Sequence, residues 1–239
     1  MAKVNLLYEG KAKKVYSTED KNVLIVSYKD DATAFNGLKK GTIQGKGAIN
    51  NRVTNYLMQM LEKEGIPTHF IKELNSTETE VKAVKIVPLE VIVRNIIAGS
   101  LSKRTGQPEG TLIKEPILEF SYKNDELGDP MVNEYHIRAL GWATQAEIDQ
   151  ISSYALKINA ILIEYFKKLG ITLVDFKLEF GITNDGVLVL ADEISPDTCR
   201  FWDSTTGEKL DKDRFRRDLG EVTEAYVEIY ERLQAALEK

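Results

Sequence analysis

The residues whose types and spacing could do chemistry are most concentrated within residues 173–197. Apolar side chains occupy alternate positions in the first part of this stretch, so Asp175, Lys177 and Glu179 share the opposite face of one predicted strand. Asn-Asp-Gly at 184–186 is a strong turn signal, because tight hairpin turns need residues that accept positive φ. The stretch therefore predicts a β-hairpin with carboxylates and a lysine on one face.

The register of this hairpin decides whether two carboxylates meet. If Asp185 and Gly186 form a two-residue loop, counting back along both strands places Glu179 opposite Asp192. Like charges directly opposite destabilise a ladder unless a cation lies between them, and Mg²⁺ typically takes one or two carboxylates plus substrate phosphates. A three-residue loop would instead pair Glu179 with Ala191. The alternative interpretation is an exposed acidic hairpin face.

A second candidate site is a short basic turn between two predicted strands within residues 5–17. Its exposed N–H groups and flanking ammonium groups could cradle phosphates, and Val15 beyond it could cover a flat ligand. The turn matches neither common phosphate-loop motif, and a solvated basic hairpin tip is the alternative. This basic turn consists of Gly10, Lys11, Ala12 and Lys13.

A second glycine-rich stretch, residues 41–47, does not match a P-loop, because Gly47 stands where Ser or Thr must hold Mg²⁺.

Two further candidates lie on either side of a predicted strand at 90–95. Before it, Pro88 removes a ladder donor, and the bend lined by Val84 and Val87 could hold an adenine ring; an ordinary strand bend is the alternative. At its end, Arg94 is a preferred bidentate partner of phosphate.

Ser100 is predicted to begin a short helix, so a phosphate could meet both its hydroxyl and a helix N-terminus. Alternatively Ser100 only caps that helix and the basic residues near it are solvated. An irregular segment at 195–200 brings Arg200 near the carboxylate pair.

The elements that must position these residues are readable from periodicity. Further strands are predicted at 24–28, 68–74, 79–87 and 117–122. A helix over 49–61 ends at Gly65-Ile66-Pro67, and a capping box opens a second helix from Thr144 to about Leu169 that leads directly into the hairpin. A helical pattern resumes at about residue 211.

Composition excludes several classes of function. The 239 residues have 43% hydrophobic and 29% charged content, no apolar run near the roughly 20 residues of a membrane span, and no signal-peptide pattern. A net charge of −5 argues against nucleic-acid binding, and Cys199 as the one cysteine favours the reducing cytoplasm. Neither histidine has a partner at ligand or triad spacing, so zinc and Ser-His chemistry are not expected.

Two segments of the sequence are long and specific motifs, PLEVIVRNIIAGS at 88–100 and LVDFKLEFG at 173–181. Shorter motifs agree with them: GKAKKVY, GIPTHF, DPMVNE, ADEISPDTCRFWD and DKDRFR. Together they resemble one family, the SAICAR synthetases (phosphoribosylaminoimidazole-succinocarboxamide synthases) of purine biosynthesis, and the resemblance covers essentially the whole chain. One departure is Asn36, where many members carry Asp, so a carboxylate contact at this position is not carried over.

The resemblance implies an α+β fold related to protein kinases. An antiparallel N-terminal sheet domain over 1–87 would cover the nucleotide, and a larger α/β domain with C-terminal helices over 88–239 would hold substrate and metal, with the nucleotide cleft between them. The implied activity is an ATP-dependent ligation of L-aspartate to carboxyaminoimidazole ribonucleotide, and a homodimer is what the family suggests.

The resemblance also assigns roles to the candidates. The basic turn and Val15 would cover ATP, with Val84 and Val87 lining the adenine site, and Glu179 and Asp192 would hold Mg²⁺. The ribonucleotide phosphate would be gripped by Arg94, Ser100 and Arg200. Around the transferred phosphoryl group and the substrate carboxylate would lie Asp175, Lys177 and Lys123.

A carboxylate is a poor acyl donor, so ATP is expected to convert it to an acyl phosphate, a step that needs charge neutralisation and positioning. Asp175 is the candidate base for the aspartate amine, or it orients Lys177 or a substrate amine. Two other hypotheses stay open: a small-molecule kinase, which would ignore aspartate, and a catalytically silent nucleotide-binding module.

Overall fold

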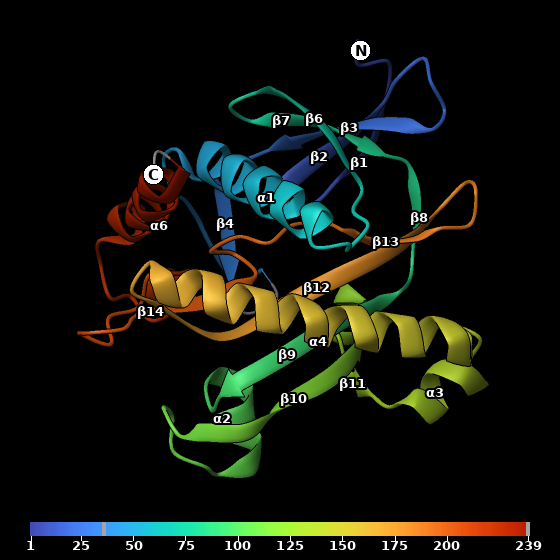
Figure 1. Cartoon of the computed structure of the whole chain (residues 1–239). Coiled ribbons are helices and arrows are strands. Elements are labelled where there is room, and N and C mark those ends of the chain that lie inside the picture. Colours follow the sequence, from blue (N-terminus) through green and yellow to red (C-terminus); the bar gives the residue numbers. More distant parts are fainter. Residues whose placement is uncertain (35–36, 238–239) are drawn as a thin grey trace.

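The computed structural model describes residues 1–34 and 37–237, whose strands form three antiparallel sheets flanked by helices (Figure 1). This arrangement confirms the predicted α+β fold with an antiparallel N-terminal sheet. The N-terminal sheet has the order β1-β2-β3-β7-β6. Its strands are β1 (Leu6–Glu9), β2 (Lys13–Ser17), β3 (Val23–Tyr28), β6 (Phe70–Asn75) and β7 (Glu78–Lys82).

The larger sheet is organised around β12, which pairs with β9, β13, β14 and β8. The strand is buried on both faces for most of its length, so the predicted carboxylate-bearing strand is a core element. The strands of this sheet are β8 (Val84–Ile86), β9 (Leu89–Ile96), β10 (Leu112–Tyr122), β11 (Met131–Val132), β12 (Ile171–Thr183), β13 (Leu188–Ala191) and β14 (Cys199–Asp203).

A small third sheet lies within residues 30–47, a polar, glycine-rich stretch for which the sequence analysis predicts no strand. It pairs β4 (Asp31–Ala34) with β5 (Lys39–Thr42). Just beyond it, the backbone N–H groups of Gly45 and Gly47 donate to the Asp30 carboxylate at 3.0 and 2.8 Å. These N–H groups are engaged within the protein, which agrees with the exclusion of a P-loop here.

The helices follow the apolar periodicity of the sequence. The predicted capping box is present: Thr144 Oγ1 accepts from the Glu147 N–H at 3.3 Å, and Glu147 accepts from the Thr144 N–H at 2.7 Å. Gly170 then adopts φ 67° and turns the chain into β12. The helices are α1 (Lys46–Lys63), α2 (Gly99–Thr105), α3 (Glu134–Ala139), α4 (Gln145–Lys168), α5 (Asp213–Arg216), α6 (Val222–Leu237) and the short 3₁₀ helix η1 (Asp125–Leu127).

One hydrophobic cluster joins the helices to the larger sheet. It includes Leu57 of α1, Ile158 of α4 and Phe176 of β12, all nearly inaccessible to solvent, and each such side chain contributes roughly 1.5–3 kcal/mol. In Figure 1, α4 crosses the larger sheet, while α1 contacts β3, β6 and β7 of the N-terminal sheet. Helix α1 therefore contacts the N-terminal sheet and also belongs to the main core. No described helix is long and apolar enough to span a bilayer.

Candidate active site

The charged face of β12 opens into a cavity of about 550 Å³. Its walls come from the β1–β2 turn, β12, the segment that follows β13 and the segment around α5. Eight of the residues predicted from sequence therefore line one space: Gly10, Lys11, Ala12, Lys13, Lys123, Lys177, Glu179 and Asp192.

The hairpin register differs from the first expectation. Glu179 pairs with Ala191, not with Asp192, because residues 184–186 form a three-residue loop closed by the Thr183 N–H donating to the Val187 carbonyl at 3.0 Å. Gly186 takes φ 84°, as such loops require. The pairing on which the metal prediction was based is therefore wrong.

Asp192 nevertheless lines the same cavity as Glu179. It lies just beyond the end of β13 with φ 59°, a left-handed conformation that is uncommon for a residue other than glycine. Strained backbone of this kind clusters at functional sites. The two carboxylates thus meet across the cavity, and not as ladder partners.

Lysines surround both carboxylates. Lys123 Nζ lies 2.6 Å and Lys177 Nζ 3.4 Å from Glu179 Oε1, while Lys13 forms ion pairs with Asp192 and, at 3.0 Å, with Glu193. Burial, reinforced by Asp192, raises the pKa of Glu179. Burial opposes ionisation of Asp192 as well, but Lys13 and Lys177 outweigh it and lower its pKa to about 2.

The donor chemistry of this pair fits Mg²⁺ held jointly with phosphates. The two carboxylates face one cavity, and their pKa values are shifted in opposite directions. Mg²⁺ sites commonly combine one or two carboxylates with substrate phosphates and water. Within residues 1–34 and 37–237, no group of three or more Asp, Glu, His or Cys side chains forms a complete protein-only metal site. The carboxylates therefore suit a metal that arrives with its phosphate ligand.

A second cavity of about 150 Å³ adjoins the first, with Lys177 and Arg216 lining both. It contains the predicted residues Arg94, Ser100, Asp175 and Arg200.

Asp175 organises this smaller cavity. Arg94 Nη1 and Arg200 Nη1 donate to its carboxylate at 3.0 and 2.9 Å, and Arg94 Nη2 donates to Ser100 Oγ at 3.2 Å. Arg200 passes so close to Gly99 that a Cβ at this position would overlap its guanidinium. The geometry favours Asp175 as an anchor for two arginines. Ser100 is not the cap of α2, whose N-cap is Ala98 without a side-chain bond.

Three predicted nucleotide contacts lie outside the lining of the larger cavity. Val15 packs against the small cluster of Val26 and Tyr28, Val87 belongs to the main core, and Val84 packs on Gly181. Their assignment to the adenine site stays a prediction. Asn36, the departure from the family pattern, lies outside the described residues.

Sequence reasoning missed several lining residues, among them four in and around α5 and in the segment before β14, of which two carry positive charge. Lys212 and Arg216 are one helical turn apart in α5 and its cap, within the DKDRFR motif, so their i,i+4 spacing was the available signal. The other two, Asp197 and Thr198, line both cavities.

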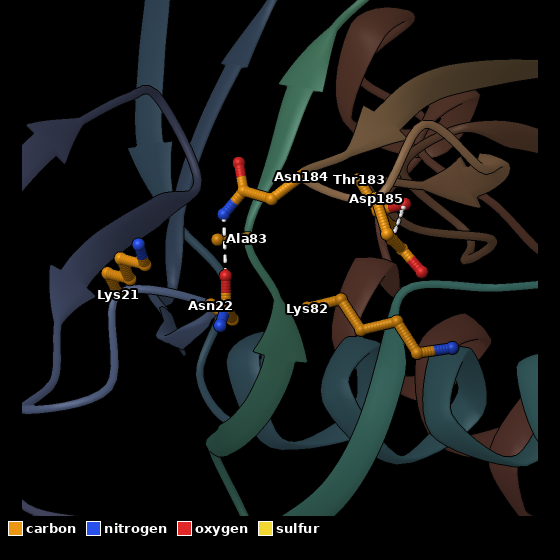
Figure 2. Close-up of a pocket in the computed structure, with 7 residues that line it drawn as sticks. All are labelled: Lys21, Asn22, Lys82, Ala83, Thr183, Asn184 and Asp185. Carbon is orange, nitrogen blue, oxygen red and sulfur yellow. Dashed lines mark hydrogen bonds between the residues drawn. The ribbon is translucent and has the colours of Figure 1, made fainter.

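A third hollow, of about 750 Å³, is separate from the two cavities that contain the predicted site residues. It lies between the turn before β3 and the tip of the β12–β13 hairpin (Figure 2). Asn184 Nδ2 donates to Asn22 Oδ1 at 2.7 Å across it, as the dashed line shows. Lys21, Asn22, Asn184 and Asp185 are exposed, and none of the predicted site residues lines the hollow. The hollow lies between two surface turns, and no buried ionisable group lines it.

Fold and site together define an α+β protein with a charged cleft, in which lysines and arginines lie beside carboxylates. The sequence profile of the SAICAR synthetase family matches residues 6–233. A relative named phosphoribosylaminoimidazole-succinocarboxamide synthase, from Lachnoclostridium phytofermentans, is 64% identical over 233 residues, covering 98% of this chain and 99% of its own. The chain belongs to the SAICAR synthetase family.

Solved structures agree with this assignment. The phosphoribosylaminoimidazole-succinocarboxamide synthase of Ehrlichia chaffeensis superposes with a TM-score of 0.95 at 50% identity, covering 97% of this chain and 99% of its own. A SAICAR synthetase in complex with ADP superposes with a TM-score of 0.93 at 54% identity, covering 95% of this chain and 97% of its own.

Proposed function

We propose that this chain is an ATP-dependent ligase of de novo purine biosynthesis. It joins L-aspartate to the carboxylate of carboxyaminoimidazole ribonucleotide and releases ADP and phosphate. The observation that carries the proposal is the pair of adjoining cavities: carboxylates and a basic turn line one, and an arginine cluster lines the other. Family membership and the ADP complex of a similar enzyme support it.

ATP occupies the larger cavity in this proposal. Gly10, Lys11, Ala12 and Lys13 contact its phosphates, and its base extends beyond the lining of the cavity toward Val15, Val84 and Val87. Glu179 and Asp192 would hold Mg²⁺, which when bound neutralises phosphate charge during transfer.

The ribonucleotide binds through its phosphate in the smaller cavity. Arg94 and Arg200 are held by the buried Asp175 and so present their remaining N–H donors without rearranging. Ser100 adds a hydroxyl beside Arg94. The imidazole carboxylate then faces the junction of the cavities, beside Lys177.

The reaction proceeds in two steps. A carboxylate oxygen of the ribonucleotide bonds to the γ-phosphorus of ATP, and ADP leaves with the electron pair of the broken P–O bond. The aspartate amine then attacks the acyl carbon, phosphate departs and the nitrogen loses a proton. Lys177 and Lys123 stabilise the negative charge of the transferred group. Glu179, with Glu90, outweighs the effect of burial and raises the pKa of Lys177, which keeps its ammonium charged.

Asp175 was predicted as the base for that proton. Its contacts with two arginines favour a third role, which is to position Arg94 and Arg200 and not Lys177 or a substrate amine.

We also propose that the enzyme works in the cytoplasm as a homodimer. The lone cysteine, Cys199, is a buried thiol whose pKa is raised by burial, which suits a protein that uses no disulfide. Light scattering coupled to size-exclusion chromatography tests the dimer.

The deciding experiment measures ADP release with the ribonucleotide present, with and without L-aspartate. The proposal expects aspartate-dependent release together with a new amide product. ADP release indifferent to aspartate, without the amide, would identify a small-molecule kinase instead. No turnover with bound nucleotide would identify a silent binding module.

A further inference from the structure

The smaller cavity has arginines on walls that come from distant parts of the chain. Arg94 lies on β9, whereas Arg200 comes from β14. A phosphate held by both arginines requires each guanidinium to keep its orientation. Asp175 holds the two of them, and Arg200 has a second anchor outside the lining of the cavity.

That second anchor is Asp213. Its carboxylate accepts from Arg200 Nε at 3.0 Å and from Arg216 Nη1 at 2.7 Å, and the residue is only 1% exposed. Burial opposes ionisation of Asp213, but the charges of Arg200 and Arg216 outweigh it and lower its pKa to about 2. Two buried carboxylates, Asp175 and Asp213, therefore fix the plane of the Arg200 guanidinium.

Arg217 is a competitor for the same anchor. Its Nη2 lies 3.3 Å from Asp213 Oδ2, the oxygen that accepts from Arg200 Nε. An Arg217 side chain that moved closer would draw the carboxylate away from Arg200, because both guanidinium groups would then bind one oxygen.

Glu109 holds Arg217 back from this approach. Arg217 Nη1 donates to Glu109 Oε1 at 3.0 Å and its Nη2 donates to Oε2 at 2.7 Å, the bidentate geometry of strong charge-assisted pairs. The hydrogen bonds from Arg217 lower the pKa of Glu109 to about 2, with Lys209 as a third donor at 3.1 Å. Among the residues that the structure describes, only Glu109 and Asp213 form ion pairs with Arg217.

The position of Glu109 is itself fixed. It lies in the loop between α2 and β10, where the Gly110 N–H donates to the Ile97 carbonyl and the Ile97 N–H donates to the Thr111 carbonyl, both at 2.8 Å. These bonds attach the loop to the residues just before α2, the helix that carries Ser100. Glu109 therefore restrains Arg217 from the α2 side of the smaller cavity.

We propose that Glu109 is a positioning residue for the phosphate of the ribonucleotide. By holding Arg217 in a bidentate pair, it leaves Asp213 to Arg200 and so fixes the guanidinium that binds the phosphate. The inference rests on the proposed function, which places that phosphate beside Arg200. Glu109 lines neither cavity, so it acts through Arg217 and Asp213 and does not touch a substrate.

The test measures steady-state kinetics for Glu109→Gln, Arg217→Gln and the double variant. Glu109→Gln releases Arg217 toward Asp213, so the KM for the ribonucleotide rises about three- to tenfold. The kcat and the KM values for ATP and L-aspartate stay within about twofold, because binding of the phosphate is the same in the ground and transition states. The pair is about one-third exposed, which keeps the effect moderate.

The double variant separates positioning from a general loss of stability. Arg217→Gln alone removes the competitor and leaves the ribonucleotide KM within about twofold of the wild type. The double variant lacks the competitor as well, so it recovers the wild-type KM that Glu109→Gln loses. An ion pair that served only stability would not be restored by removing its second member.

Glu228→Gln is the matched control. Glu228 forms the same kind of pair with Arg232 on α6, and neither residue lines either cavity, so all three KM values stay unchanged. Circular dichroism melts establish that the variants are folded.

An unchanged ribonucleotide KM in folded Glu109→Gln overturns the inference. A double variant as impaired as Glu109→Gln also overturns it, because Arg217 would then not be the cause. A rise of equal size in all three KM values does the same. These outcomes differ from failure of the proposed function, in which the wild type itself makes no aspartate-dependent amide.

Discussion

At the scale of single residues, the cleft depends on buried carboxylates that lie beside lysines. Glu179 is 4% exposed and has two lysines around it, so it combines high basicity with nearby positive charge. In the proposed function, a metal bound there with ATP would compete with those lysines for the same oxygens. The metal dependence of the reaction would then be sensitive to this one side chain.

Glu179→Gln keeps the size of the side chain and removes one anionic ligand. We expect the Mg²⁺ concentration for half-maximal activity to rise on the order of tenfold, with the fold retained. Initial rates across a Mg²⁺ titration measure this. Asp185→Asn, at the exposed tip of the same hairpin, serves as the control with unchanged dependence. Near-normal activity of Glu179→Gln at limiting Mg²⁺ would refute the metal assignment.

Asp211 provides a residue-scale prediction about pH. It is fully buried and accepts from the N–H groups of Phe201 at 2.8 Å and Asp213 at 2.6 Å. Burial, with the Asp213 charge adding to it, raises its pKa to about 7 from the ordinary 3.8. Between these values the folded state binds more protons than the unfolded state. The stability contribution is therefore complete below about pH 4 and is lost as the pH rises through 7.

Asp211→Asn removes the titration. The free energy of unfolding of the wild type minus that of the variant should fall as pH rises from 4 to 7 and then level off. Urea unfolding at several pH values measures it. A difference independent of pH would contradict the raised pKa.

Prediction of single residues from the sequence succeeded where strand alternation alone decides on which face a side chain lies. The strand alternation marked Asp175, Lys177 and Glu179 as one face, and the structure puts Lys177 and Glu179 in one cavity. The hairpin register failed, because Asn-Asp-Gly is compatible with both two- and three-residue loops. Lys212 was missed because its place in the cavity depends on contacts between segments distant in sequence, and no local pattern carries that information.

At the scale of elements, α4 and the chain reversal after it determine where β12 begins. The capping box satisfies N–H groups at the start of the helix, and Gly170 ends it one residue before the strand. Periodicity was sufficient to predict α1, α4 and the hairpin. It missed the β4–β5 pair because the alternation in β4 rests on two small side chains, Ala32 and Ala34, and β5 has no apolar side chain at all.

Thr144→Ala tests the contribution of the cap. Loss of the side-chain acceptor should destabilise the protein by about 1 kcal/mol, equivalent to a melting temperature lower by roughly 2–4 °C for a chain of this size. Thr144→Ser, which retains the hydroxyl, is the matched control. Urea and thermal unfolding report both. A loss equal in the two variants would show that the methyl group, not the cap, carries the effect.

At the scale of the whole molecule, the cleft connects the two predicted domains, 1–87 and 88–239. The larger cavity takes Lys13 from the first and Glu179 and Asp192 from the second. Helix α1 adds a permanent connection, since it contacts the N-terminal sheet while its apolar side chains pack in the main cluster. The division into domains stays a prediction, whereas the shared core predicts cooperative unfolding.

Nucleotide binding should therefore stabilise the molecule as one unit. At ADP and Mg²⁺ concentrations about 100-fold above the dissociation constant, linkage adds about 2.7 kcal/mol, or a melting temperature higher by roughly 5–10 °C. Calorimetry should show a single transition that moves as a whole, because the ligand contacts both walls of the cleft. Glu179→Gln should lose the part of the shift that depends on Mg²⁺. Two transitions, of which ADP moves only one, would show instead that the sheets unfold independently and that nucleotide binds to one alone.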